Sequence, residues 1–286
     1  MDHVPTEFYE DLLLNAFSNG FRYEYMHLPG RIASCAERFK EKGHKKCVWI
    51  KKRAISSINY FDSFSKLKQP ESIVQASKFC FMKILNVRGK EKRNSSIDDR
   101  LKRQLEKFLR EPGMMCLRLH NAKLNQSRIE LFSSWKSLKF VSVTKEFNDS
   151  VYTLLQKLSD QKQLLYLRIW CDVNDSRIAD LICKFLEQPQ FLDVQFAGIY
   201  PEEVKNGIVS KGKENKGMCA GKIVQWKGFV KLHDDSFECS GRTYYATVIQ
   251  HQKENLVVEY INNSATDKTT DKEFMMNVEA SNLCFQ

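Results

Sequence analysis

The residues of this chain that could do chemistry do not fall into a catalytic or metal-binding pattern. Its six histidines show no HExxH motif and no zinc-ligand spacing to any of the nine cysteines, and a metal site needs several convergent ligands. The Gly- and Lys-rich stretch 211–222 is similar to a phosphate loop, but Met218-Cys219 stands where a Walker motif requires Lys and Ser or Thr after Gly217. The adjacent acids Asp98-Asp99 and Asp234-Asp235 suit a helix N-terminus and a turn. We therefore expect no active site and no cofactor.

Positive charge gathers in two segments of the sequence. The chain carries a formal net charge of +10, and the run from Lys40 to Arg53 holds seven Lys or Arg residues against one Glu. A second cluster runs from Arg88 to Arg103. Such a run, interleaved with His44 and Trp49, could contact phosphates, and its candidate residues are Lys45, Lys46, Lys51, Lys52 and Arg53. We favour the alternative of a solvated helix end followed by a strand, because no nucleic-acid motif is present.

A short pattern recurs four times in the middle of the chain. It begins at Cys116, Phe140, Tyr166 and Asp193, so that successive copies start 24, 26 and 27 residues apart. This period is typical of leucine-rich repeats. Alternating apolar residues within each copy suit a short parallel strand, and helix-like patterns lie between copies. The sequence predicts an α/β fold: an irregular leucine-rich-repeat-like curved stack, with parallel strands inside and helices outside, stabilised by stacking of neighbouring units.

One polar position is shared by the four copies. It holds Arg118, Ser142, Arg168 and Gln195, each between two apolar residues that face inward. Successive side chains of a strand point to opposite faces, so these four should lie on the concave face. They are candidates for a ledge that binds a substrate, with an ordinary exposed sheet face as the alternative.

The flanking segments have other periods. Apolar residues at helical spacing predict a helix over 6–18, a second from Leu28-Pro29-Gly30 to Gly43, and a third over 96–110 that is capped by Ser96. Strands are expected at Cys47–Ile50 and Phe79–Met82, with 54–76 left ambiguous.

The C-terminal part changes to a period of two. We expect a loop over 201–218, strands at 223–226, 243–250 and 256–261, the last two as a hairpin, and a mobile stretch at 262–272. The predicted domains are 1–43, a helical segment; 44–218, the repeat region; and 219–286, a β-rich region with a flexible tail.

Apolar runs and cysteine usage indicate the cellular compartment in which the protein works. Apolar runs are four or five residues long, far short of the roughly 20 needed to cross a bilayer. The first residues lack the basic start and apolar core of a signal peptide. The odd number of cysteines, without a CxxC pair, then predicts reduced thiols that act as small buried hydrophobes. We expect a cytoplasmic or nuclear protein.

The N-terminus resembles a divergent F-box. The resemblance is carried by Val4-Pro5-Thr-Glu-Phe8 before an apolar helix, then by Leu28-Pro29 and a helix ending Glu37-Arg38-Phe39. Near the other end, Ser240-Gly241 and Ala246-Thr247-Val248 are similar to the F-box-associated domain. The whole chain is similar to nematode F-box and F-box-like proteins.

This resemblance implies a non-enzymatic adaptor of a Skp1-cullin-F-box type ubiquitin ligase. The first 40 residues would dock on a Skp1-like adaptor, and the array and C-terminal strands would hold a protein substrate for ubiquitination. The implied adaptor contacts are Pro5, Phe8, Leu12, Leu13, Ile32 and Phe39. Two alternatives stay open: a repeat-based interaction module without a ubiquitin role, in which the N-terminal helices only cap the core, and a basic nucleic-acid-binding protein.

Overall fold

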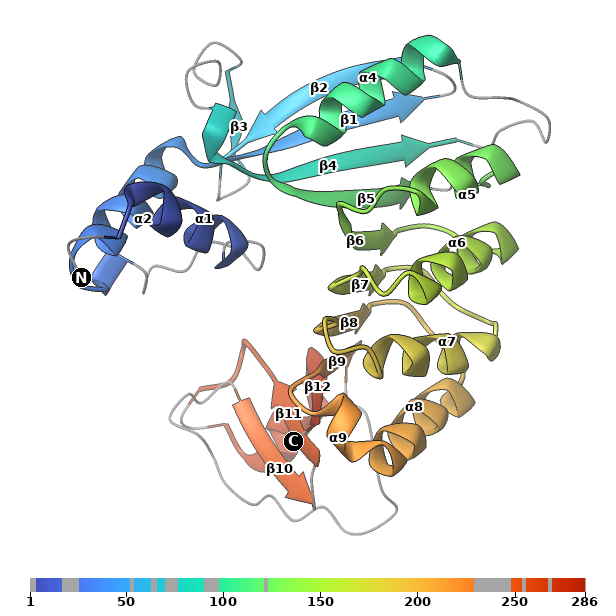
Figure 1. The fold of residues 1–286 in the computed structure, drawn as a ribbon. Helices are drawn as coiled ribbons and strands as arrows, with labels where there is room; N and C mark the ends of the chain where they lie inside the picture. The colour runs from blue at the N-terminus through green and yellow to red at the C-terminus, as the bar shows by residue number, and fades with distance from the viewer. Residues whose placement is uncertain are drawn as a thin grey trace. The chain divides into compact units, whose positions relative to one another are not determined.

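The fold is mixed α/β and divides into two compact units, residues 1–140 and 141–286. Figure 1 shows the computed structural model, in which helices and strands alternate along much of the chain. Each unit is described by itself below. The structure describes residues 4–16, 26–51, 54–62, 66–69, 77–89, 98–120, 123–228, 248–253, 256–266 and 269–285.

The first unit opens with two helices. Helix α1 spans Thr6–Ala16, and α2 spans Arg31–Lys42. Gly43 closes α2, where its N–H donates to the carbonyl of Phe39. Both predicted N-terminal helices are therefore confirmed within the described residues.

Five strands of the sheet follow in this unit, in the order β3-β2-β1-β4-β5. Strand β1 pairs in parallel with β4, and β4 pairs in parallel with β5, whereas β2 and β3 are antiparallel additions at the edge. The predicted strands around Trp49 and Phe81 are confirmed, and much of the ambiguous segment 54–76 proves to be strand. The bounds are β1 His44–Lys51, β2 Ala54–Phe61, β3 Leu67–Lys68, β4 Cys80–Arg88 and β5 Met114–His120, with a 3-10 turn η3 at Ser77–Phe79 before β4.

Two further helices belong to this unit, α4 (Asp99–Arg110) and α5 (Gln126–Ser133). Asp98 caps α4 by accepting a hydrogen bond from the N–H of Arg100. The predicted cap, Ser96, lies outside the described residues. Apolar side chains at helical spacing, Leu101, Leu105 and Phe108, bury the inner stripe of α4 as the sequence predicts.

Strand β6 (Leu138–Val143) contains the boundary between the units, and the second unit continues with the repeats. Strands β7 (Tyr166–Ile169) and β8 (Asp193–Phe196) match the predicted copies residue for residue. Helices α6, α7 and α8 lie on one side of β7, β8 and β9 (Figure 1). The bounds are α6 Asp149–Asp160, α7 Arg177–Leu186, α8 Glu202–Glu214, α9 Lys216–Cys219 and β9 Ile223–Lys227.

The loop predicted over 201–218 is wrong, because α8 and α9 occupy it. Val204 and Ile208 stand four residues apart and are fully buried, so this segment has the inner stripe of a helix. Gly207 lets α8 pack closely on α7, since a Cβ there would lie 3.3 Å from that of Ala179. Glycines in this segment predict a break, but Gly207 and Gly212 of α8 serve close packing instead.

Four strands complete the second unit, in the order β9-β12-β11-β10, and each is antiparallel to its neighbour. The predicted hairpin is confirmed by β10 (Val248–Lys253) and β11 (Leu256–Ile261), while residues 243–247 lie outside the described part. Strand β9 pairs in parallel with β8 and so continues the repeats. The region expected to end in a flexible tail holds α10 (Asp271–Met276) and β12 (Ala280–Phe285), which lies between β9 and β11.

The described cysteines are free thiols, as expected. All but Cys284 are buried, and burial raises the pKa of Cys80 to about 11 and that of Cys183 to about 12. These thiols therefore pack as hydrophobic groups. No helix in the described part of the chain is long and apolar enough to cross a membrane.

Candidate binding surfaces

The N-terminal helical pair is anchored from inside by a few apolar residues. Leu13 of α1 is buried, and so are Cys35 and Phe39 on the inner stripe of α2. The ring of Phe39 meets that of Phe79 edge to face, with centroids 5.1 Å apart. These contacts fix the pair to the start of β4.

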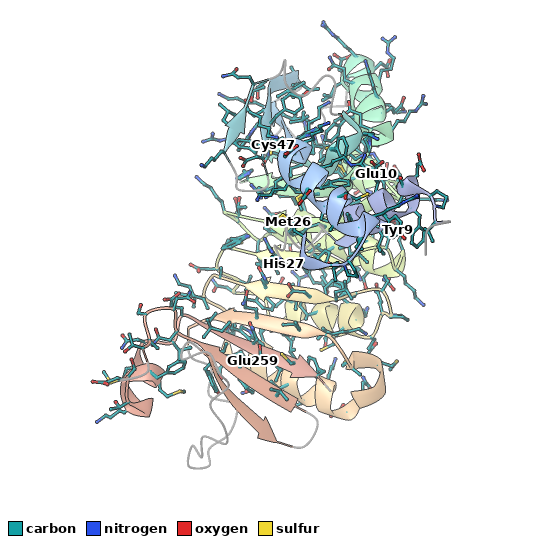
Figure 2. The ribbon with its side chains drawn as sticks, turned by 90° about the vertical axis from the view of Figure 1, so that its left-hand side faces the viewer. Tyr9, Glu10, Met26, His27, Cys47 and Glu259 are labelled. Carbon is teal, nitrogen blue, oxygen red and sulfur yellow. The ribbon has the colours of Figure 1, made fainter. Side chains whose placement is uncertain are left out.

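A small ionic cluster around Glu10 also holds α1 in place. The carboxylate of Glu10 lies 3.4 Å from the guanidinium of Arg38 and 3.3 Å from the ammonium of Lys78. Figure 2 shows Glu10 where α1 meets α2, with Tyr9 farther out on α1. The orientation of α1 is therefore set by apolar and charged contacts together.

Apolar side chains remain exposed on the outer side of α1. Phe8 is 55% exposed and Leu12 is 46% exposed. They stand four residues apart, so they are neighbours on one face of the helix. Pro5, just before α1, and Leu28, just before α2, are also exposed. We call Pro5, Phe8 and Leu12 the α1 apolar face.

The six residues that were candidates for adaptor contact thus divide into two groups. Pro5, Phe8 and Leu12 are accessible, and Ile32 is half-buried. Leu13 and Phe39 are only 1% and 2% exposed, so they support the helical pair from within and present no surface to a partner.

The second unit carries a polar row across five strands. Register places Arg168 of β7 beside Gln195 of β8, and Gln195 beside Gln225 of β9. Gln225 stands beside Asn282 of β12, which stands beside Glu259 of β11. All five side chains are half-buried. Figure 2 labels Glu259 at the end of this polar row.

The polar row faces away from the helices. Its neighbours in sequence, such as Val194 and Val224, are fully buried and register with each other. Because successive side chains alternate, the buried set lies on the side covered by α7 and α8, and the polar row lies on the other.

Hydrogen bonds link members of the polar row. The side-chain amide of Gln225 donates to Oδ1 of Asn282 at 2.8 Å, and the amide of Asn282 donates to a carboxylate oxygen of Glu259 at 3.3 Å. The amide of Gln195 donates to Oδ2 of Asp193 at 3.3 Å. Hydrogen bonds thus join Gln225, Asn282 and Glu259, and the row places amides between a cation, Arg168, and an anion, Glu259.

Asp193 is the electrostatically unusual residue beside this row. Burial raises the pKa of its carboxyl to about 6, against the opposing influence of Arg168 and of the Gln195 hydrogen bond. Its Oδ1 is buried and accepts no hydrogen bond among the described residues. Partial burial without full hydrogen bonding is the physical cause of the shift.

The predicted ledge of four residues is only half realised. Arg168 and Gln195 do lie side by side. Ser142 is 1% exposed and presents no surface. Arg118 belongs to the first unit, where it stands beside Asn86. Sequence reasoning missed Gln225, although Val224-Gln-Trp226 repeats the pattern of Val194-Gln-Phe196.

The basic run does not form one patch. Lys46 pairs with Glu111 at 2.6 Å on the side of the sheet that α4 covers. Lys45 lies on the other side, with its Nζ 5.7 Å from the ring centroid of Phe81. Lys51 is exposed, and Lys52 and Arg53 lie outside the described residues.

Among the described residues, no group of three or more His, Cys, Asp and Glu side chains could hold a metal ion. Comparison with protein-family models, with curated proteins and with solved structures finds no match to this chain. The candidate surfaces are therefore interpreted from their own chemistry.

Proposed function

We propose that this protein is a non-enzymatic, cytoplasmic or nuclear adaptor whose N-terminal helical pair docks on a Skp1-like protein. The observation that carries the proposal is the α1 apolar face. Phe8 and Leu12 are exposed side by side while Leu13 anchors the same helix. An exposed pair of large apolar side chains on a fixed helix suits a groove in a partner.

The energy of such contacts is sufficient for specific docking. Burial of one Phe or Leu side chain contributes about 1.5–3 kcal/mol. A few anchors of this kind dominate many protein interfaces.

The proposed substrate site is the polar row, on a degenerate leucine-rich-like stack. Strands stand about 4.8 Å apart, so five strands span roughly 19 Å from Arg168 to Glu259. Side-chain amides between opposite charges suit an extended polypeptide segment with complementary charges. The protein would then present this substrate for ubiquitination by the assembled cullin-type ligase, acting by proximity.

A pull-down with purified Skp1-like proteins tests the proposal. Wild type should bind, and the double variant Phe8→Asp/Leu12→Asp should lose binding by at least tenfold. The matched control is Ile199→Asp/Met276→Asp, because both residues are 75% exposed and lie in the second unit. It should bind like wild type.

Failure of the wild type to bind any Skp1-like paralogue would overturn the ubiquitin role. The helical pair would then serve as a cap, and the chain would be a repeat-based interaction module. Circular dichroism of each variant separates loss of docking from loss of fold.

A further inference from the structure

A second surface, on the first unit, brings together residues from both basic segments of the sequence. Register places Lys51 of β1 directly beside Arg88 of β4, and Arg88 beside His120 of β5. Two residues earlier on the same strands, Trp49 and Arg118 flank Asn86. We call Trp49, Lys51, Arg88, Arg118 and His120 the basic-aromatic cluster.

The cluster lies on the side of the sheet opposite α4. Lys83 stands three residues before Asn86 on β4, so the two side chains face opposite sides of the sheet. The side chain of Lys83 reaches the carbonyls at the end of α4. Side chains of opposite parity therefore project from the other face. The members of the cluster also lie toward the carboxyl ends of three parallel strands.

Two rings of the cluster form a stack. The ring centroids of Trp49 and His120 are 5.0 Å apart, with an angle of 26° between the planes. The side chain of Asn86 is buried, and its amide nitrogen lies 3.5 Å from the carbonyl of Val48. Its Oδ1 thus faces Nε2 of His120 at 3.1 Å, which makes that nitrogen the donor. The imidazole is therefore held in place against the indole.

The charged side chains of the cluster, Lys51, Arg88 and Arg118, are all positive. Strands β1, β2, β4 and β5 contain no Asp or Glu. Within the described ranges, no carboxylate forms an ion pair with Lys51, Arg88 or Arg118. Like charges directly opposite on neighbouring strands destabilise a sheet. A bound polyanion would relieve the repulsion between Lys51 and Arg88.

We propose that the basic-aromatic cluster binds single-stranded nucleic acid. Phosphates would lie against Lys51, Arg88 and Arg118, and an unpaired base would extend the stack of Trp49 and His120. Cations that follow the backbone, combined with aromatic rings for bases, are the general means of binding single strands. A duplex keeps its bases stacked within the helix and offers the rings much less. This inference is independent of the adaptor proposal, since it concerns a different surface.

Fluorescence anisotropy with a labelled 12-nucleotide oligouridine tests the proposal. Wild type should bind with an affinity that falls as salt rises, and more tightly than to a duplex of equal length. Lys51→Gln/Arg88→Gln should weaken binding and reduce the slope of log K against log salt by about 1.4, since each phosphate contact contributes roughly 0.7. Lys102→Gln/Lys107→Gln, on the exposed side of α4, removes the same charge and should change neither.

The aromatic part is tested by two further variants. Trp49→Leu keeps an apolar side chain, and His120→Gln keeps a donor for Asn86. Each should weaken oligouridine binding by about 5- to 150-fold, the range of one base-stacking contact, with the salt slope unchanged. The His120 variant keeps the test valid if the Trp49 variant does not fold.

Three results would overturn the proposal. They are absence of salt-dependent binding by the wild type, equal loss in the α4 control, and binding of duplex or heparin as tight as that of oligouridine. Equal affinity for a single-stranded oligodeoxythymidine would support it, because the cluster reads bases and phosphates.

Discussion

Gly212 of α8 lies against the ring of Phe285 in β12. A Cβ at Gly212 would stand 2.0 Å from Cε1 and 2.6 Å from Cζ of that ring. Phe285 is only 4% exposed, so its ring is packed in the interior of the second unit. The missing side chain therefore lets α8 approach the last strand of the second unit.

We predict that Gly212→Ala destabilises the protein. Overpacking should cost about 1–3 kcal/mol, which exceeds the gain of roughly 1 kcal/mol from replacing a helical glycine. Urea unfolding measures the difference. Gly217→Ala is the control, because nothing lies within 4 Å of the place that a Cβ would take there. If Gly212→Ala were as stable as the control, or if Phe285→Leu failed to relieve its cost, the close contact would be contradicted.

The same contact shows why part of the fold could not be predicted. Strands β7 and β8 follow from local alternation, which the sequence displays directly. The glycines of α8 predict a loop, because their role in packing against α7 and β12 depends on the tertiary structure. Strand β12 alternates half-buried and buried residues, but its sequence, Ala-Ser-Asn-Leu-Cys-Phe, does not alternate polar with apolar types. Its place between β9 and β11 depends on partners distant in sequence.

The candidate surfaces were predictable to a similar extent. The shared position of Arg168 and Gln195 within the repeated pattern correctly predicts that they lie side by side. It could not reveal that Ser142 is buried, or that Lys51 meets Arg88. Cross-strand register and tertiary cover decide these points, and neither is visible within one segment of sequence.

A buried lysine of β4, Lys83, caps the C-terminal end of helix α4. Lys83 is 1% exposed, and its ammonium donates to the carbonyls of Leu109 at 2.7 Å, Phe108 at 3.2 Å and Glu111 at 2.5 Å. The last carbonyls of a helix lack donors within the helix. A cation at this end also interacts favourably with the helix dipole. Lys222 likewise donates to the carbonyls of Leu186 and Met218.

Lys83→Met should therefore lower the free energy of unfolding by about 2–3 kcal/mol, since it leaves buried acceptors without a donor. Lys102 is exposed on α4, and the free energy of unfolding of Lys102→Met should stay within about 0.5 kcal/mol of the wild-type value. Chemical denaturation of both variants makes the comparison. Equal stabilities would show that the carbonyls do not depend on Lys83.

Asp193 should make stability depend on pH between about 4 and 6. Burial raises its folded pKa from an ordinary 3.8 to about 6. The folded protein thus binds more protons than the unfolded chain in this window, so its stability falls as pH rises through it. Above pH 6 the carboxylate is charged in the folded protein, and its burial lowers the free energy of unfolding by at most roughly 3 kcal/mol.

Asp193→Asn should consequently be more stable than wild type by about 1–3 kcal/mol at pH 7.5, with the gain fading near pH 4. Denaturation curves at several pH values measure this gain. Asp160→Asn, exposed at the end of α6, is the matched control and should change the free energy of unfolding by less than about 0.5 kcal/mol at pH 7.5. A gain that stays constant from pH 4 to 7.5 would argue against titration of Asp193.

Two phenylalanines of the helical pair should separate folding from docking. Phe39 is buried against Phe79, whereas Phe8 is 55% exposed. Phe39→Ala should cost about 3 kcal/mol through the cavity it leaves and should speed proteolysis of residues 4–42. Phe8→Ala should change stability by less than about 0.5 kcal/mol.

The two variants also have different consequences for a partner. If α1 docks through its exposed face, Phe8→Ala weakens binding to a Skp1-like protein without altering protease resistance, whereas Phe39→Ala affects both together. An equally large loss of stability in Phe8→Ala would mean that this ring belongs to the core. The α1 apolar face would then be a support for the fold and no longer a surface for a partner.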